Sequence, residues 1–142
     1  MDIKGYILPD ELLYDKKHFW IKDKDTFITL GMTDFAVRLA GEFVFVDIVE
    51  PGKKVEKDKV FMSVESGKWV GRVTSPIDGE IVEVNEELEF EPEKLNEDCY
   101  EEGWLVKIKI RDRSQLEELM TVKEVEPWLL DEIKRVKGED KE

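Results

Sequence analysis

Hydrophobic and polar positions alternate along most of this chain in short runs, which predict β-strands rather than helices. The runs are rich in Val, Ile and Phe, and Gly, Pro, Asp or Lys residues typical of turns separate them. The predicted strands are Phe19–Ile21, Thr26–Leu30, Phe43–Val49, Phe61–Glu65, Trp69–Thr74, Glu80–Val84 and Trp104–Ile110. The pattern therefore indicates a mainly β protein.

Two of these strands belong to an internal repeat. Gly41–Asp47 resembles Gly79–Asn85 at a spacing of 38 residues, with four identical positions. Two duplicated strand units are what a quasi-two-fold β-sandwich requires. The first copy leads into Phe43–Val49, whose nearly continuous apolarity predicts a strand buried on both faces.

A short helix is predicted over residues 33–40. Thr33 or Asp34 can serve as its N-cap, and Gly41 can close it as a C-cap. Its inward-facing side chains are expected to be Phe35, Val37 and Leu39.

The C-terminal part is predicted to be helical. Ser114 is expected to cap a helix over residues 114–120, and Pro127, as a first helical residue, opens one over residues 127–137. The tail after Gly138 is expected to fray. Between the last two predicted strands, residues 86–96 form a polar loop with room for one helical turn.

The length of 142 residues predicts one domain over 1–142, with a core over about 12–112 and a C-terminal helical segment over about 114–137. A net charge of −13 disfavours nucleic acid and anionic membranes as partners. One His and one Cys argue against a metal site, a His-based triad or an internal disulfide. No apolar run approaches the roughly 20 residues that cross a bilayer. The N-terminus lacks the features of a targeting signal, so a cytoplasmic location is expected. The chain is also expected to be a monomer.

The most informative stretch is Ser66-Gly67-Lys68, which lies between two predicted strands. Ser and Gly supply turn chemistry, so Lys68 is expected at the tip of a β-hairpin. A lysine there is a flexible amine held clear of the protein, which makes it a candidate for covalent modification. The alternative is a solvated charge that protects a sheet edge.

Seven segments in order carry a resemblance to a known family. They are His18–Ile21, Leu30–Ala36, Gly41–Val46, Val64–Lys68, Ser75–Asn85, Asn96–Tyr100 and Gly103–Ile108. From about Leu12 to Met120 the chain resembles the H-protein of the glycine cleavage system, the lipoyl carrier of that complex. The resemblance implies the barrel-sandwich hybrid fold of lipoyl and biotinyl carriers, with short flanking helices that include a C-terminal one.

By this resemblance Lys68 carries lipoate in amide linkage. The family pattern has an acid three residues before the lysine and a glycine eleven after it, both associated with the lipoylating enzymes; Glu65 and Gly79 occupy these positions. A biotin carrier is a poorer match, because its lysine lies between methionines. His18 is the one titratable ring in the group of residues that the resemblance places near the arm, and a structural role is the favoured interpretation for it.

The resemblance also implies a function without catalytic residues of its own. The arm accepts the aminomethyl group of glycine from a pyridoxal-phosphate decarboxylase and delivers it to a folate-dependent aminomethyltransferase. A dihydrolipoyl dehydrogenase then reoxidises the dithiol. The cofactor carries the chemistry, and the protein presents it.

Four residues depart from the family pattern around the arm. Gly67 and Trp69 stand where Val and Ala are typical, Phe19 stands for a Glu, and Arg72 for an Asp. Carboxylates suit an amine cargo better than an apolar ring and a cation do. The departures leave open a carrier of sulfur intermediates beside a heterodisulfide-reductase-like enzyme, or a lipoyl relay. The alternative of a different class is an unmodified interaction module with the sandwich fold, and the presence of Glu65, Lys68 and Gly79 argues against it. They also leave open that Phe19 is core and Arg72 a solvated strand residue.

Overall fold

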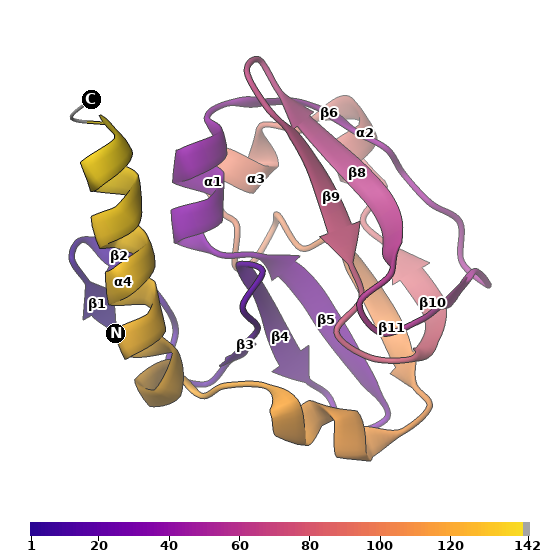
Figure 1. Ribbon diagram of the computed structural model, residues 1–142. Coiled ribbons are helices and arrows are strands. Elements are labelled where there is room, and N and C mark those ends of the chain that lie inside the picture. The colour runs from indigo at the N-terminus through magenta and orange to yellow at the C-terminus, as the bar shows by residue number, and fades with distance from the viewer. Residues whose placement is uncertain (141–142) are drawn as a thin grey trace.

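Two antiparallel sheets carry most of the chain, and the last helix packs beside them (Figure 1). The computed structural model describes residues 1–140, with side chains described through Val136. The larger sheet has the order β3 (Leu13–Tyr14), β4 (Phe19–Asp23), β5 (Phe27–Met32), β11 (Val106–Ile110), β10 (Gly79–Val84) and β7 (Lys54–Val55). The smaller sheet has the order β6 (Phe43–Val46), β8 (Val60–Ser66) and β9 (Val70–Thr74). A separate pair, β1 (Asp2–Ile3) and β2 (Tyr6–Ile7), lies near the C-terminal helix.

The main core lies between the two sheets. Side chains from both contribute to it, among them Ile28, Val64 and Ile108, each of which is fully buried. The two repeat copies form β6 and β10 and lie in different sheets. The mainly β sandwich is thus confirmed, together with a C-terminal helix.

Strand β6 differs from its prediction in length and in burial. It ends at Val46 rather than Val49, and the register shifts between Phe43 and Phe45. Val44 is 61% exposed and Phe45 is 49% exposed, so the expectation of burial on both faces was wrong. The reason is topological: β6 is an edge strand of the smaller sheet, and its apolar side chains are divided between the core and the outer face.

Helix α1 (Asp34–Ala40) agrees with the prediction at both ends. Thr33 Oγ1 accepts a hydrogen bond from the backbone N–H of Ala36 at 3.3 Å. Gly41 has a φ of 88°, a left-handed conformation that favours glycine. Leu39, which was expected to face inward, is 45% exposed. Phe35 and Val37 provide the buried face instead.

The terminal helix α4 (Val122–Asp140) begins five residues before the predicted start at Pro127. Thr121 Oγ1 accepts from the N–H of Glu124, and the Glu124 carboxylate accepts from the N–H of Thr121. This reciprocal pair is a capping box. Pro127 therefore lies inside the helix, where it has no N–H to donate to the carbonyl one turn earlier.

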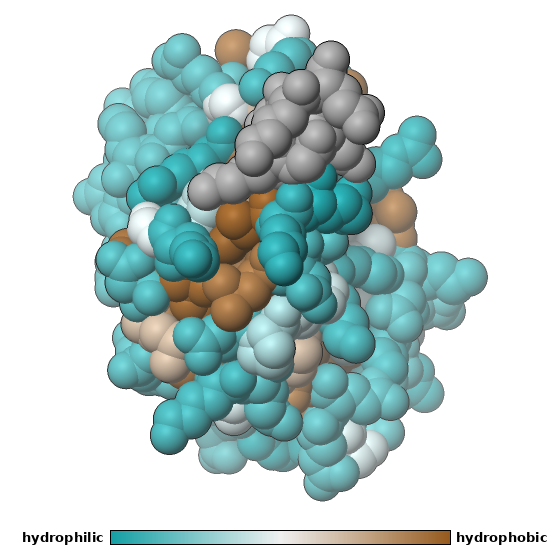
Figure 2. Space-filling model, turned by 60° about the vertical axis from the view of Figure 1, so that its left-hand side comes forward, coloured by the Kyte–Doolittle hydropathy of each residue, from teal (hydrophilic) through white to brown (hydrophobic). Residues whose placement is uncertain are grey.

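Four side chains of α4 at helical spacing form the inner face of a second core. They are Val122, Val125, Leu129 and Ile133. They pack with residues of the N-terminal arm, β3, β4 and α1: Ile3, Leu8, Leu12, Tyr14, Trp20 and Phe35. Figure 2 brings this side forward and shows an apolar area framed by hydrophilic side chains. The helix is therefore part of the folded body, and no helix among residues 1–140 is long and apolar enough to cross a membrane.

Three short helical turns complete the chain. The polar loop holds two of them, α2 (Glu87–Phe90) and α3 (Lys94–Glu97), where one was expected. The third, η1 (Arg113–Glu118), is a 3-10 helix rather than an α-helix over residues 114–120. Its cap is Asp112, not Ser114, because the Asp112 carboxylate accepts from the Ser114 N–H at 3.0 Å.

Candidate functional site

The β8–β9 hairpin presents Lys68 at its tip, as the sequence predicts (Figure 1). The Ser66 N–H donates to the Trp69 carbonyl at 2.8 Å and closes the turn, and the Lys68 N–H donates to Ser66 Oγ at 3.4 Å. Gly67 and Lys68 are both exposed. Five register pairs between β8 and β9 hold the base of this turn. The backbone around Lys68 is thus held by hydrogen bonds, and its side chain is exposed.

The Lys68 side chain lies over Gly41, the residue that ends α1. A methyl group built on Gly41 would be 3.3 Å from Lys68 Cε and 4.0 Å from Nζ. Among residues 1–136, whose side chains are described, no carboxylate lies within 4.0 Å of Lys68 Nζ. An exposed primary amine without a carboxylate partner is what acylation of a lysine requires, so the residues present fit a lipoyl group attached there.

Trp69 packs onto the sheet below the tip. Its indole ring lies so close to Gly71 that a methyl group added there would overlap the ring, which would have to shift. It also makes an edge contact with the buried Phe43, with ring centroids 6.3 Å apart and an interplanar angle of 71°. Trp69 is nevertheless 43% exposed. It covers the end of the smaller sheet and still offers one side of its ring to solvent.

Glu65 and Arg72 lie on the same hairpin as Lys68. Glu65 is half-buried, with Phe45 and Val70 as its neighbours on the adjacent strands. Arg72 is exposed on β9, opposite Ser63. This exposure agrees with a solvated strand residue, one of the two alternatives that the sequence left open, and a role of Arg72 toward the cargo stays a prediction.

Gly79 lies in the other sheet, where it starts β10 between Val55 and Ile110. A methyl group at this position would overlap the Lys109 carbonyl oxygen and come within 2.7 Å of Ile108 Cγ2. Close approach of β11 thus requires a glycine here. The structure gives Gly79 a packing role that sequence reasoning missed; its recognition by lipoylating enzymes stays a prediction.

His18 lies under the C-terminal helix. Its ring lies between those of Phe35 and Trp128 and is tilted against both, with centroid distances of 4.9 and 4.8 Å, and its Nε2 is 3.0 Å from Glu132 Oε1. Phe19 is 5% exposed and belongs to the main core. Packing therefore accounts for both residues, and it explains why an apolar ring stands where the family has a carboxylate. Their inclusion in the surroundings of the arm rests on the resemblance alone.

The His18 contact predicts a pH dependence of stability. Burial lowers the pKa of His18 below its usual 6.5, against the opposing effect of the bond to Glu132. The folded state thus favours the neutral ring, and the free energy of unfolding falls as pH drops from 6.5 to the lower folded pKa. Glu132, whose pKa is lowered mainly by Arg135, contributes stability that is lost only below its usual 4.5.

We expect His18→Asn to remove this dependence. Asn is the replacement of choice because His18 has a φ of 71°, which Asn tolerates. The difference between urea midpoints at about pH 7.5 and about pH 5.5 should shrink relative to the native chain. An unchanged difference would assign the pH dependence to other groups.

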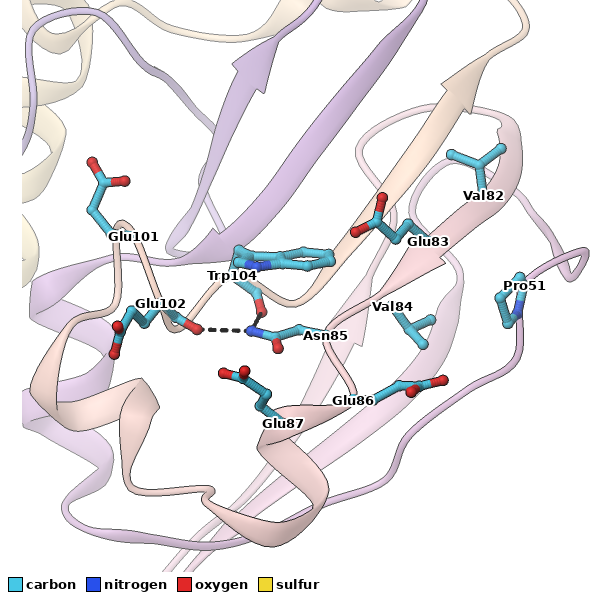
Figure 3. A pocket seen from close by; sticks show the side chains of 10 residues that line it. All are labelled: Pro51, Val82, Glu83, Val84, Asn85, Glu86, Glu87, Glu101, Glu102 and Trp104. Atoms are coloured by element: carbon cyan, nitrogen blue, oxygen red, sulfur yellow. Dashed lines mark hydrogen bonds between the residues drawn. The ribbon is translucent and has the colours of Figure 1, made fainter.

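A separate groove of about 660 Å³ lies along β10 and the segment before β11 (Figure 3). Its lining is dominated by carboxylates, namely Glu83, Glu86, Glu87, Glu101 and Glu102, around Asn85 and Trp104. Asn85 Nδ2 donates to the carbonyls of Glu102 and Trp104 at 2.7 and 2.8 Å, which ties this segment to the end of β10. Two of these carboxylates form ion pairs with lysines: Glu83 with Lys107, and Glu87 with Lys94. None of the lining residues belongs to the Lys68 hairpin.

Comparison with known proteins places this chain in a family. The family model described as glycine cleavage H-protein matches residues 12–132. The glycine cleavage system H protein of Halalkalibacterium halodurans is 43% identical over 125 residues, which cover 88% of this chain and 98% of that protein. Glycine cleavage system H protein 4 of Aquifex aeolicus is 36% identical over 140 residues, which cover 99% of this chain and 82% of that protein.

A solved structure supports the same assignment. The crystal structure of a glycine cleavage system H protein from Mycobacterium marinum has a TM-score of 0.76 and 32% identity, and the match covers 82% of this chain and 94% of that one. The fold and the exposed hairpin lysine define a carrier-type β-sandwich. The chain belongs to the glycine cleavage H-protein family.

Proposed function

We propose that this chain is the lipoyl carrier protein of the glycine cleavage system and that Lys68 is the residue that carries lipoate. The observation that carries the proposal is the position of Lys68: an exposed amine at the tip of a β-hairpin, in a chain of this family. The relatives are named for the glycine cleavage system, and nothing in them favours the alternative of a carrier of sulfur intermediates.

The proposed role of the chain is to hold the lipoyl-lysine at the tip of a hairpin where other proteins can reach it. The bond between Ser66 and Trp69 and the pairs of β8 with β9 hold the base of the turn, so the motion of the arm is confined to the side chain. A tether of this kind replaces diffusion between enzymes by a high effective concentration. When bound, lipoate supplies a dithiol that takes part in redox and group-transfer reactions. The protein itself is proposed to be non-catalytic.

The proposed partners follow from this role. They are a pyridoxal-phosphate glycine decarboxylase, a folate-dependent aminomethyltransferase, a dihydrolipoyl dehydrogenase and the lipoylating enzymes. Glu65 and Gly79 are proposed to be read by the lipoylating enzymes. The acidic surface, with a net charge of −13, suits electrostatic docking onto basic protein surfaces. The proposed compartment is the cytoplasm.

Loading of the arm tests the choice of cargo. Lipoylated protein incubated with glycine and a glycine decarboxylase should gain the mass of an aminomethyl group, as measured by intact-mass spectrometry. The matched control is the Lys68→Arg protein, which should gain none. A lipoylated protein that stays unloaded with glycine but takes up sulfur species would reverse the choice in favour of the sulfur carrier.

A further inference from the structure

A hollow of about 320 Å³ opens on the larger sheet, among residues of β4, β5, β11 and the turns beside them. A volume of this size suits a small ligand. This site, the aromatic hollow, contains no residue of the Lys68 hairpin. Aromatic rings and lysines dominate its lining, namely Lys22, Lys24, Phe27, Tyr100, Trp104 and Lys107.

The register of the sheet places the aromatic hollow on the side away from the core. Lys22, Thr29 and Lys107 are paired in one row across β4, β5 and β11. Their chain neighbours Ile28 and Ile108 are fully buried in the main core. Because successive side chains of a strand point to opposite faces, the row faces outward. A ligand can therefore reach the hollow without any rearrangement of the sandwich.

Hydrogen bonds hold two of the aromatic residues of the hollow in place. Tyr100 Oη donates to the Ile7 carbonyl at 2.6 Å and accepts from the Asp34 N–H at 2.9 Å. The Trp104 carbonyl accepts from Asn85 Nδ2 at 2.8 Å, at the boundary with the groove shown in Figure 3. Both aromatic side chains are half-buried. A wall that is already ordered costs little conformational entropy when a ligand binds.

Three lysines lie beside these rings, and two of them have no carboxylate partner. Among residues 1–136, no carboxylate lies within 4.0 Å of Nζ of Lys22 or Lys24, and both side chains are exposed. The third, Lys107, has its Nζ 5.0 Å from the centroid of the Trp104 ring and 5.8 Å from that of Phe27. Cationic groups and aromatic rings thus occupy the same hollow.

The aromatic hollow reverses the charge balance of the chain. The sequence has 35 acidic and 22 basic residues, whereas the hollow is lined by three lysines and a single carboxylate, that of Glu101. Glu83, outside the hollow, pairs with Lys107 at 3.3 Å, and the lysines still outnumber the two carboxylates. An excess of ammonium groups beside ordered rings suits a flat ring that carries an anionic group.

We propose that the aromatic hollow binds a small ligand that combines a planar aromatic ring with a phosphate or carboxylate group. The ring stacks against Phe27 and Trp104, and the anionic group pairs with Lys22 and Lys24. Lys68 lies on a hairpin of the smaller sheet, whereas this site lies on the larger sheet. The inference therefore goes beyond the proposed carrier function and does not depend on it.

The test uses two probes that share this chemistry and differ in the source of the charge. Adenosine monophosphate carries a phosphate, and indole-3-acetate carries a carboxylate. Adenosine and indole are the matching compounds without charge, and inorganic phosphate and acetate are those without a ring. Each compound is titrated into the isotope-labelled full chain, and amide NMR gives both the Kd and the residues whose signals shift.

We expect at least one charged probe to bind with a Kd of about 1 mM or below at about 0.1 M salt. The shifted amides should belong to β4, β5 and the segment before β11. The compounds that lack the charge or the ring should bind at least about fivefold more weakly. The tighter of the two probes identifies the anionic group that the site prefers.

Matched lysine variants locate the anionic group. The double variant Lys22→Gln/Lys24→Gln should weaken binding of the charged probe by about fivefold or more, because both cations of the proposed contact are lost. Lys54→Gln/Lys59→Gln removes the same charge from two exposed lysines outside the aromatic hollow. Its Kd should stay within about twofold of the native value, since salt screens charges at a distance.

A second pair of variants tests the ring contact. Phe27→Leu keeps an apolar side chain but removes the flat ring, so it should weaken binding about threefold or more. Phe90→Leu removes the 81% exposed ring of α2, outside the aromatic hollow, and should leave the Kd within about twofold of the native value. Urea midpoints of all variants confirm that they are folded.

The proposal is overturned if neither charged probe shifts the amides of these segments at about 10 mM. It is overturned equally if adenosine or indole binds as tightly as its charged counterpart, or if phosphate or acetate alone reproduces the full affinity. Equal weakening by the two lysine double variants would assign the effect to net charge and would also refute the site. None of these outcomes bears on the lipoylation of Lys68.

Discussion

Gly79→Ala is expected to destabilise the protein by about 3 kcal/mol, the upper part of the range for forced overpacking. The added methyl group would overlap the Lys109 carbonyl oxygen and crowd Ile108 Cγ2 at 2.7 Å. Backbone atoms of a central strand cannot move aside cheaply, because β11 pairs with both β5 and β10. Urea unfolding followed by tryptophan fluorescence would measure the change as a lower midpoint at an unchanged slope.

Gly67→Ala is the matched control for this substitution. Gly67 has no heavy atom within 4 Å of the added methyl group, and it is not among the residues with positive φ. Its replacement should change stability by about 1 kcal/mol or less, in the stabilising direction, because alanine restricts the unfolded chain. Equal midpoints for Gly79→Ala and the native protein would contradict the packing role of Gly79.

The same pair of variants separates packing from recognition at Gly79. If the glycine acts through packing alone, the folded fraction of Gly79→Ala should be lipoylated at the native rate per molecule. A slower rate in protein that is shown to be folded would support a direct role in recognition by the lipoylating enzyme. The proposal that Gly79 is read by that enzyme therefore has its own measurable consequence.

Local patterns were sufficient to predict the sandwich and the hairpin. Strand runs bounded by turn residues placed β4, β5, β8, β9 and β10 within a few residues of their observed ends. Ser66 and Gly67 predicted the turn at Lys68, and Thr33 with Gly41 predicted the two ends of α1. Each of these features depends on residues adjacent in sequence, which is why the sequence alone could indicate them.

Features that depend on tertiary contacts could not be predicted. The apolar run of β6 looks buried, yet Val44 and Phe45 are exposed, and β6 lies at the edge of the smaller sheet. His18 belongs to the interface with α4 because its ring contacts Trp128 and Glu132, both more than a hundred residues away in the sequence. Phe19, for which the sequence left open a place beside the arm or in the core, belongs to the main core.

The start of α4 was predicted wrongly although the local sequence contains a signal for it. The start of α4 was placed at Pro127 because proline is common at the first helical position. Thr121 and Glu124 have the spacing of a capping box, which marks the true start at Val122. The extra turn brings Val122 and Val125 into the second core, so the position of this helix against the body depends on it.

Lys68→Arg is expected to abolish lipoylation altogether. Arginine keeps the positive charge, and the turn should persist, since the Lys68 side chain is exposed and makes no ion pair with the side chains of residues 1–136. The guanidinium stays protonated and is a poor nucleophile, so no amide can form. Stability should remain within about 0.5 kcal/mol of the native value, as for an exposed surface substitution.

The lysines elsewhere in the chain are internal controls for this variant. Lys94, for example, is held by Glu87 and Glu91 at 2.9 and 3.2 Å, and Lys53 donates to the Phe61 carbonyl at 3.0 Å. Lys68 differs from these two lysines in its position on an exposed turn, a position that Lys4 and Lys24 also have at the β1–β2 and β4–β5 turns. Peptide mapping must therefore show which lysine of the native chain is modified.

The most direct test is the intact mass of the native and Lys68→Arg proteins before and after incubation with a lipoate ligase, lipoate and ATP. The carrier function proposed for this chain predicts one lipoyl increment on the native protein and none on the variant, with peptide mapping that assigns the increment to Lys68. An increment of the same size on Lys68→Arg, or no increment on the native protein, would contradict it.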